Sequence, residues 1–256
     1  MNQQERTVAI LAQLEARGQM SVSDICDLFG ISKDTARRDI ILLEEMELAE
    51  RFHGGIRKPF LRPRLEAYRS RLITHAKTKQ LLGRAAAKLV RDNDVVMLDL
   101  SATVQFVGEN ITAGNVFAVT NSVDTAMVLL NTNVEQVYLT GGFLFPETHA
   151  LSGMSVLEKI REFHFDIAFI GATAVRPEGI YYTAQDDITL KKSIKQISDK
   201  VVLVADHTKF DEIAPFRLDF SGVHVFVTDS TPPRELMKVL KQHNITVMVI
   251  EPSRDA

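Results

Sequence analysis

Residues 21–40 have the sequence SVSDICDLFGISKDTARRDI, and residues 51–55 have the sequence RFHGG. Ser21 is placed to cap a short helix with Asp24 in its first turn, and Gly30 supplies the left-handed turn that ends it. Ser32 is placed to cap a second helix directly afterwards. The segment therefore predicts two short helices joined by a tight turn, which is a helix-turn-helix.

Apolar residues recur through this segment at three- and four-residue steps: Val22, Ile25, Phe29, Ile31, Ala36, Ile40 and Leu43. This spacing puts them on one side of each helix, where they pack. The polar residues of the second helix, Lys33, Thr35, Arg37 and Arg38, are left on another side. The second helix is therefore predicted to present a polar edge to the major groove of DNA.

The same residues resemble the DeoR/GlpR-type family of bacterial transcription regulators. In that family the second helix carries Ser-x-x-Thr-x-Arg-Arg-Asp and a short wing ends in His-Gly-Gly. Here the run extends from Ser32 to Asp39, and the wing ends at His53-Gly54-Gly55. Ala36 stands where a β-branched residue is common, a departure that concerns packing. A helix-turn-helix alone is compatible with a purely structural role, but the wing at the expected distance disfavours that role.

The polar edge and the resemblance together predict the DNA-binding residues: Ser32, Lys33, Thr35, Arg37, Arg38, Arg51, His53, Arg57 and Lys58. A net charge of −3 argues at first against a nucleic-acid partner. The segment from Arg51 to Lys79, however, contains a single acid, Glu66. Its basic residues are Arg51, Arg57, Lys58, Arg62, Arg64, Arg69, Arg71, Lys77 and Lys79. Positive charge beside a DNA-reading motif indicates phosphate contacts, and a solvated basic linker without a partner is the alternative.

The composition places the chain in the globular class. With 256 residues and 45% apolar content it is long enough for one small and one medium domain. The only cysteine, Cys26, excludes an internal disulfide and a cysteine-based zinc site. The histidines lack metal-ligand spacing, so no metal or other cofactor is predicted. No secretory leader or membrane-spanning run is visible, which predicts a cytoplasmic protein.

The positions of the predicted helices, the wing and the prolines indicate two domains. A helix within residues 4–17 and a wing near 47–57 complete a winged helix-turn-helix domain over residues 1–58. Pro59 and Pro63, flanked by arginines, mark a linker over 59–74. An α/β domain for effector sensing and oligomerisation is then predicted over 75–256, and it opens with a helix over 75–90.

In the second domain short β-branched runs alternate with helical patterns. The runs lie at 95–100, 116–120, 136–140, 167–170, 201–206, 223–228 and 245–250, and the helical patterns at 122–130, 155–162, 187–198 and 233–243. This alternation is typical of an α/β fold with a mainly parallel sheet.

Small or polar residues follow several of the predicted strands: Asp99, Ser101, Ala102, Thr103, Asn121, Ser122, Gly141 and Gly142. In open parallel sheets the carboxyl ends of the strands form the usual ligand crevice. Helix N-termini at that edge favour an anion. A phosphorylated small molecule is therefore the predicted ligand.

The family resemblance extends over this domain and implies a sugar-phosphate isomerase-like fold. Members commonly show Asp-x-Gly-Thr-Thr, Thr-Asn-Ser, Gly-Gly, a Glu-containing loop followed by Lys, and Asp-x-x-Lys-Phe. The corresponding places implied here as effector-binding are Asp99 to Thr103, Asn121-Ser122, Gly141-Gly142, Asp186-Asp187 with Lys191, and Asp206 with Lys209. The first and fourth depart from the pattern. Ser101 in place of Gly hinders close approach to phosphate, and Ala102 removes a hydroxyl, so the effector is expected to differ or to bind less tightly.

The charged residues of this domain leave two classes of function open. An isomerase site is conceivable from Asp99, Asp186, Asp187, Lys191, Asp206 and Lys209, with a carboxylate as base and a lysine stabilising the enediolate. Binding is favoured, because a lost hydroxyl and shortened acids disturb catalytic placement more than recognition. Tyr181 and Tyr182 stack on a ligand in one interpretation and simply pack in the other.

The sequence thus predicts a ligand-responsive transcriptional regulator. We expect a repressor of a carbohydrate-utilisation operon that acts on double-stranded DNA as a homo-oligomer and is released by a phosphorylated metabolite. A sugar-phosphate isomerase with a DNA-binding appendage is the alternative. A third class is an architectural DNA binder that is insensitive to small molecules.

Overall fold

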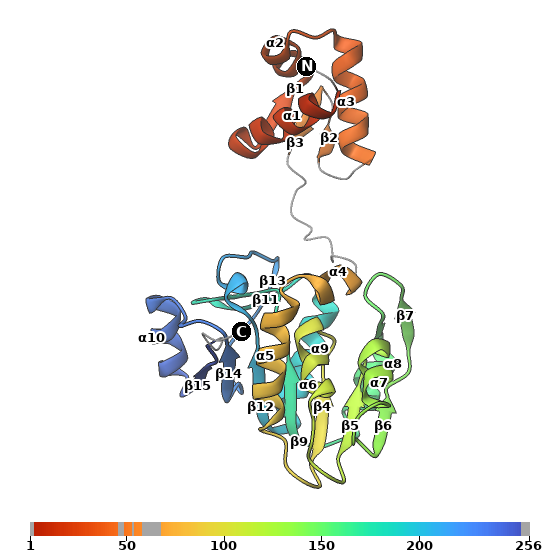
Figure 1. Cartoon of the computed structure of the whole chain (residues 1–256), viewed down its shortest axis with the longest axis vertical. Coiled ribbons are helices and arrows are strands. Elements are labelled where there is room, and N and C mark those ends of the chain that lie inside the picture. The colour runs from red at the N-terminus through yellow and green to blue at the C-terminus, as the bar shows by residue number, and fades with distance from the viewer. Residues whose placement is uncertain (1–2, 46–48, 53, 58–67, 252–256) are drawn as a thin grey trace. The chain divides into compact units, whose positions relative to one another are not determined.

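The computed structural model describes residues 3–45, 49–52, 54–57 and 68–251. The chain divides into two compact units, Met1–Arg62 and Pro63–Ala256 (Figure 1). Within the described part of the chain, no helix is both long enough and apolar enough to cross a membrane.

The first unit is a winged helix-turn-helix, as predicted. Its helices are α1 (Gln3–Arg17), α2 (Val22–Phe29) and α3 (Lys33–Glu45). Its antiparallel sheet has the order β1-β3-β2, with strands β1 (Gln19–Ser21), β2 (Glu50–Phe52) and β3 (Gly55–Arg57). Its core consists of Ile10, Leu14, Met20, Ile25, Ala36, Ile40, Leu43, Ala49 and Ile56. The apolar pattern of the helix-turn-helix segment therefore builds one small core, and Cys26 packs against it.

The predicted helix boundaries are confirmed by their caps. Ser21 and Asp24 form a capping box at the start of α2. Gly30 ends α2 in the left-handed conformation, with φ 61° and ψ 38°, and its N–H donates to the carbonyl of Cys26. At the start of α3 the N–H of Thr35 donates to Ser32 Oγ at 3.2 Å. Local capping chemistry therefore fixes where both helices begin and where α2 ends.

Strand β1 was not predicted from the sequence, and a glycine explains its place in the sheet. Gly55 of β3 pairs with Ser21 of β1. A Cβ atom at Gly55 would lie 2.2 Å from the carbonyl oxygen of Met20, so only glycine allows this approach. The second glycine of the wing motif therefore ties the wing to the segment that precedes α2.

The second unit has a seven-stranded sheet, which confirms the predicted α/β fold class. Its order is β15-β14-β12-β9-β4-β5-β6, and all its neighbouring strands are parallel. The strands are β4 (Val95–Leu98), β5 (Phe117–Thr120), β6 (Gln136–Leu139), β9 (Phe165–Ile170), β12 (Ser198–Val204), β14 (Val225–Thr228) and β15 (Thr246–Val249). Each begins or ends within a few residues of a predicted β-branched run.

Helices cover both faces of this sheet. On one face pack α5 (Ala76–Ala87), α6 (Ala102–Glu109) and α7 (Val123–Leu129), and on the other α8 (Met154–Ile160), α9 (Gln185–Gln196) and α10 (Arg234–Gln242). Figure 1 shows α5 and α6 in front of the central strands. Successive strand residues alternate between the two cores: Val202 and Val204 join one, and Val201 and Leu203 join the other. Burial on both faces explains the continuous apolar runs of these strands.

Helix α6 was not among the predicted helical segments. All its residues from Ala102 to Gly108 are buried, so it has no polar face and no amphipathic period. It also crosses α5 closely, because a Cβ atom at Gly83 would lie 2.5 Å from the carbonyl oxygen of Phe106. A helix enclosed in this way leaves no periodic signal in its sequence.

Smaller elements complete the second unit. They are α4 (Tyr68–Ile73), the hairpin of β7 (Phe143–Phe145) and β8 (Ala150–Ser152), the antiparallel sheet of β10 (Ala174–Arg176), β11 (Gly179–Tyr182) and β13 (Phe216–Leu218), and the 3-10 helix η1 (His207–Phe210). Helix α4 falls within the range predicted as the linker, 59–74, of which 59–67 lies outside the described residues.

Strand order reverses next to β4. The chain runs outward from β4 to β5 and β6, then returns to place β9 on the other side of β4. Such a reversal opens a crevice at the carboxyl ends of the two strands. Asp99 to Ser101 follow β4 and Gly171 follows β9, so both segments lie at this point.

Replacing Gly171 by alanine tests the packing at this reversal. A Cβ atom there would lie 2.2 Å from Ser101 Oγ and 2.5 Å from Ser101 Cβ. We expect Gly171→Ala to destabilise the protein by about 1–3 kcal/mol through overpacking. Adding Ser101→Gly should restore most of that loss, since glycine in place of serine at a helix N-cap costs only a few tenths of a kcal/mol. Urea unfolding of the four variants measures this coupling. A double variant no more stable than Gly171→Ala alone would contradict it.

Candidate functional site

Helix α3 presents the predicted DNA-reading residues on its exposed side. Lys33, Arg37 and Arg38 are exposed, and Thr35 is half-buried and within 2.9 Å of Ser32 through their hydroxyls. Arg37 lies 3.7 Å from Asp34 one turn earlier, and its side chain is 63% exposed. Such an exposed pair contributes little to stability and is easily exchanged for a phosphate. The polar edge is therefore free to meet a ligand.

A buried ion pair lies on the packed side of α3, together with Ala36, Ile40 and Leu43. Asp39 has no solvent exposure, and its carboxylate accepts from Arg6 of α1 at 2.5 Å (Nε to Oδ2) and 3.0 Å (Nη2 to Oδ1). Gln3 donates to the same carboxylate at 3.3 Å. The hydrogen bond to Asp39 raises the pKa of Arg6. Because Asp39 points inward, the neighbouring Arg37 and Arg38 point to solvent.

Asp39 was not assigned a role from the sequence, although a signal exists. It lies three residues after Ala36 and four before Leu43, both buried. An acid at that spacing belongs to the packed side of its helix and needs a buried cation.

The wing brings one further arginine to α3. A hollow between α3 and the wing is lined by Arg37, Arg51, Glu44, Val22, Ile40, Phe52, Gly54 and Gly55. Arg51 is exposed and makes no ion pair with the described residues. Arg57 is held by its cross-strand neighbour Glu50, with Nε and Nη2 each 3.1 Å from Oε2. The predicted contacts His53 and Lys58 lie outside the described residues.

In the second unit, Ser101 caps the helix that follows β4. Its Oγ accepts from the N–H groups of Thr103 and Val104 at 3.2 and 3.5 Å. Ala102 and Thr103 are buried within α6. Ser122 caps α7 in the same way, through the N–H of Thr125 at 3.2 Å. Ser101 and Ser122, both predicted to contact an effector, thus accept hydrogen bonds from the N–H groups that begin α6 and α7.

Buried Asp99 and Lys191 form a cluster with the half-buried Asp187 at the strand reversal. Lys191 Nζ donates to Asp99 at 3.1 Å and to Asp187 at 3.4 Å, and the N–H of Gly171 donates to Asp99 at 3.3 Å. Burial, together with the charge of Asp187, raises the pKa of Asp99, although Lys191 and the N–H of Gly171 act in the opposite direction. Burial by itself lowers the pKa of Lys191, but Asp187 and Asp99 raise it above its ordinary value. The ammonium is therefore held charged between two carboxylates.

Tyr182 packs beneath this cluster, which favours the packing interpretation of the tyrosine pair for this residue. Lys191 Nζ lies 4.6 Å from the centre of its ring. Burial, together with Asp99 and Asp187, raises the pKa of its hydroxyl well above the ordinary value. Among the described residues this buried hydroxyl has no hydrogen-bond partner.

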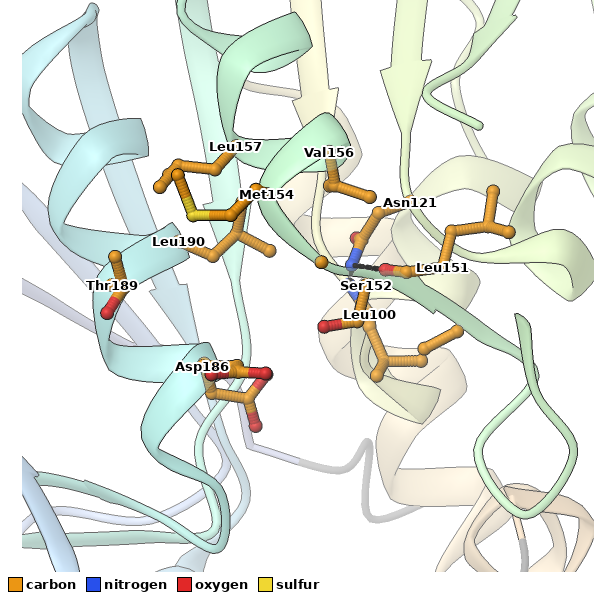
Figure 2. A pocket seen from close by; sticks show the side chains of 13 residues that line it. Leu100, Asn121, Leu151, Ser152, Met154, Val156, Leu157, Asp186, Thr189 and Leu190 are labelled. Atoms are coloured by element: carbon orange, nitrogen blue, oxygen red, sulfur yellow. Dashed lines mark hydrogen bonds between the residues drawn. The ribbon is translucent and has the colours of Figure 1, made fainter. Parts of the chain in front are cut away.

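A pocket of about 290 Å³ opens beside the cluster. Its wall is mainly apolar, and Figure 2 shows side chains from α8 and α9 facing those that follow β4 and β5. The lining residues are Leu100, Asn121, Ala150, Leu151, Ser152, Gly153, Met154, Val156, Leu157, Asp186, Asp187, Thr189 and Leu190. Asn121 shapes the wall, since its amide accepts from the N–H of Leu100 at 3.1 Å and donates to the carbonyl of Leu151 at 3.3 Å.

The structure brings three of the predicted effector residues to this pocket: Asn121, Asp186 and Asp187. Lys191 and Asp99 lie behind Asp187 in the buried cluster. The remaining predicted residues are not in the wall: Ser101, Ala102, Thr103, Ser122, Gly141, Gly142, Asp206 and Lys209. Gly141 and Gly142 follow β6 with φ angles of 71° and 112°, and Asp206 caps η1 through the N–H of Thr208 at 3.0 Å.

The apolar wall was not predicted from the sequence. Leu157 and Leu190 follow the same helical spacing as the core residues around them. No residue type distinguishes a pocket wall from a core on α8 and α9. Among the described residues, no group of three or more metal-ligating side chains is gathered in one place.

Comparison with known families matches both units. The DeoR-like helix-turn-helix domain matches residues 6–59, and the DeoR C terminal sensor domain matches residues 74–230. The chain belongs to the DeoR family. As a DeoR-family member it is a DNA-binding transcriptional regulator with a sensor domain.

The relatives are similar along the whole chain. The HTH-type transcriptional repressor GlcR of Bacillus subtilis is 34% identical over 252 residues, covering 98% of both chains. The glycerol-3-phosphate regulon repressor of Escherichia coli is 27% identical over 248 residues, covering 96% of this chain and 98% of its own. Among solved structures, ribose 5-phosphate isomerase A of Methanocaldococcus jannaschii is 20% identical, covers 53% of this chain and 54% of its own, and has a TM-score of 0.37.

Removing Asp39 tests whether the buried pair positions α3. Asp39→Ala removes the buried carboxylate to which Arg6 donates, so we expect a lower unfolding temperature and weaker DNA binding. Replacing both partners, with Arg6→Met and Asp39→Leu, should cost less stability than Asp39→Ala alone. Thermal unfolding followed by circular dichroism measures both effects. Asp34→Ala, an exposed acid on the same helix, is the matched control. Equal unfolding temperatures for Asp39→Ala and Asp34→Ala would contradict the assignment.

Proposed function

We propose that the protein is a cytoplasmic repressor of a carbohydrate-utilisation operon, active as a homo-oligomer and released from its operator by a phosphorylated sugar or related metabolite. The observation that carries this proposal is the exposure of Arg37 and Arg38 beside a buried Asp39 on α3. Two relatives similar along the whole chain are named as repressors: the transcriptional repressor GlcR and the glycerol-3-phosphate regulon repressor. Their names support the repressor assignment.

DNA contact follows from the geometry of α3 and the wing. A recognition helix of this size enters the major groove and presents residues of its first turns to base edges and phosphates. Lys33, Thr35, Arg37 and Arg38 occupy those turns, and Arg51 lies on the same hollow as Arg37. Arginine suits both guanine edges and phosphate oxygens, because its fork donates two parallel hydrogen bonds. These residues therefore supply both base reading and backbone clamping.

The size of the DNA-reading surface supports the proposed homo-oligomer. One helix-turn-helix covers one half-site, and two copies related by a two-fold axis bind half-sites about one helical turn apart. An effector that favours an oligomer geometry with displaced half-sites releases the DNA. Such coupling requires the effector to bind the two geometries with different affinity.

The pocket in the second unit is proposed as the effector site, and its chemistry supports binding without turnover. A catalytic base must reach the proton that it abstracts. Asp99 has no solvent exposure, and Lys191 is 2% exposed and hydrogen-bonded to Asp99 and Asp187. The carboxylate of Asp206 accepts a hydrogen bond from the N–H of Thr208. Because Asp99 and Lys191 are engaged with one another, we propose that the site holds a ligand without turning it over.

Enzymatic activity gives the clearest test against the isomerase alternative. We expect no interconversion of pentose or hexose phosphates above the rate of buffer alone, measured by coupled assay with the full-length protein. Conversion at ordinary enzyme rates, lost in Lys191→Met, would contradict the binding-only proposal.

Removing the arginines of α3 tests DNA recognition. We expect Arg37→Ala or Arg38→Ala to weaken operator binding by about 1–3 kcal/mol, roughly five- to 150-fold. The protein should stay folded, because both side chains are exposed. Gel-shift titration with operator DNA selected by the wild-type protein measures the loss, and circular dichroism confirms folding. Arg91→Ala removes the same charge from an exposed position in the second unit and should leave affinity unchanged. Equal affinities for the Arg37, Arg38 and Arg91 variants would refute the groove assignment.

A further inference from the structure

The hairpin of β7 and β8 exposes the apolar side chains of its outer strand. Phe143, Leu144 and Phe145 of β7 are 77%, 54% and 48% exposed. Successive side chains of a strand point to opposite faces, so both faces of β7 are open to solvent. Met154, which follows the hairpin at the start of α8, is 66% exposed. We call these four residues the hairpin patch.

Strand β8 is fastened to the body of the second unit, and β7 lies outside it. The N–H of Leu151 donates to the carbonyl of Asn121 at 2.7 Å, and Ala150 forms an isolated bridge with Ser122. Strand β7 pairs with β8, with Leu144 opposite Leu151. Its other edge has no strand partner within the described part of the chain, and Figure 1 shows β7 at the margin of the second unit. An open edge of this kind is a template for pairing with another strand.

The sequence of β7 lacks the features that keep an edge strand apart from other strands. Edge strands that stay unpaired usually carry lysine, proline or a bulge. From Gln136 to Pro146 the chain has no aspartate, glutamate, lysine or arginine, and Pro146 comes after the end of β7. An uncharged apolar surface does not attract a phosphate backbone. The surface is instead complementary to another uncharged apolar strand.

The size and symmetry of the hairpin patch suit a second copy of this chain. Two identical strands that pair antiparallel are related by a two-fold axis, so the same patch meets itself. On the scale of a whole aromatic side chain, about 150–250 Å², the four side chains expose roughly 500 Å² per copy. Two copies would then bury about 1,000 Å², the size at which specific interfaces begin.

We propose that β7 pairs antiparallel with β7 of a second copy about a two-fold axis at Leu144, so that two hairpins form one sheet of order β8-β7-β7-β8. This inference rests on the proposed function, in which the protein acts as a homo-oligomer, and it names the surface through which two copies meet. Phe143 of each copy lies opposite Phe145 of the other, and such aromatic cross-strand pairs stabilise a sheet. The open backbone groups of β7 gain hydrogen-bond partners.

The interface strand lies next to the wall of the proposed effector pocket. Ala150, Leu151 and Ser152 of β8 line that pocket, and so does Met154 of the hairpin patch (Figure 2). Because β8 is hydrogen-bonded to β7, a ligand that displaces β8 also displaces β7. Effector binding thereby alters the geometry in which two copies meet.

Charged substitutions at Leu144 test the pairing. Leu144→Lys places two ammonium groups opposite each other at the axis, and Leu144→Glu does the same with two carboxylates. We expect each variant to raise the dissociation constant of self-association by roughly tenfold or more, because like charges face each other in an apolar interface. A mixture of the two variants should restore association, since opposite charges then meet. Sedimentation velocity of the full-length protein over a series of concentrations measures the association of each sample.

Ile213→Lys is the matched control, since Ile213 is 58% exposed in the loop between η1 and β13, outside the hairpin patch. It should associate as the wild type does, and circular dichroism checks that every variant is folded. Equal association of Leu144→Lys and Ile213→Lys would overturn the proposal. So would a mixture of Leu144→Lys and Leu144→Glu that associates no better than either variant alone. A wild type that stays monomeric and sediments with phosphatidylcholine vesicles would overturn it in favour of a lipid surface.

Gel shifts with selected operator DNA separate this inference from the proposed function. Leu144→Lys should bind a duplex with two half-sites no more tightly than a duplex with one, and its affinity for a single half-site should equal that of the wild type. Cooperative binding of two half-sites by Leu144→Lys, at the wild-type level, would overturn the proposed interface and leave repression intact. Failure of the wild type to bind any DNA would instead overturn the proposed function, whereas mutual rescue of Leu144→Lys and Leu144→Glu would still support the interface.

Discussion

The buried ion pair between Arg6 and Asp39 is the constraint on which the DNA-reading surface depends. A carboxylate inside a small core is tolerated only with a hydrogen-bonded cation, and Arg6 donates to both of its oxygens. The pair joins α1 to α3 and fixes the rotation of α3 about its own axis. Arg37 and Arg38 are consequently turned outward, and the Gly55 contact with Met20 fixes the wing to the same unit. One polar interaction inside the core thus specifies the chemistry of the surface.

The second unit also contains a buried ion pair, formed by Lys191 and Asp99 where the strand order reverses. Strand order reverses beside β4, and the residues that follow β4 and β9 must pack closely there. Gly171 admits Ser101, and Lys191 neutralises part of the charge that Asp99 and Asp187 bring to the same point. The buried charges are committed to one another, while Asp186 remains exposed at the pocket. Engagement of Asp99 with Lys191 is the reason for which we propose that the site binds a ligand without turnover.

Much of the fold was predictable because its signals are local. Ser21, Gly30 and Ser32 cap helices with their own neighbours, so their roles are visible in a few residues of sequence. The parallel strands are equally clear, since burial on both faces demands unbroken apolar runs. Helix α6 escaped prediction for the opposite reason: enclosed on all sides, it has no polar face.

The sites were predictable only where a polar residue has no packing role. The exposed arginines of α3 stand out by type and spacing, whereas the leucines of the pocket wall are indistinguishable in sequence from core leucines. Serine at position 101 was expected to hinder a phosphate, and that expectation stays a prediction. In the structure its hydroxyl accepts from the N–H groups of Thr103 and Val104.

Selection of duplex DNA from a random library by the full-length protein tests whether the exposed side of α3 reads DNA. We expect enrichment of a motif with two related half-sites about one helical turn apart, with affinity that falls steeply as salt is raised. Recovery of DNA without any shared motif, or with affinity indifferent to salt, would contradict it.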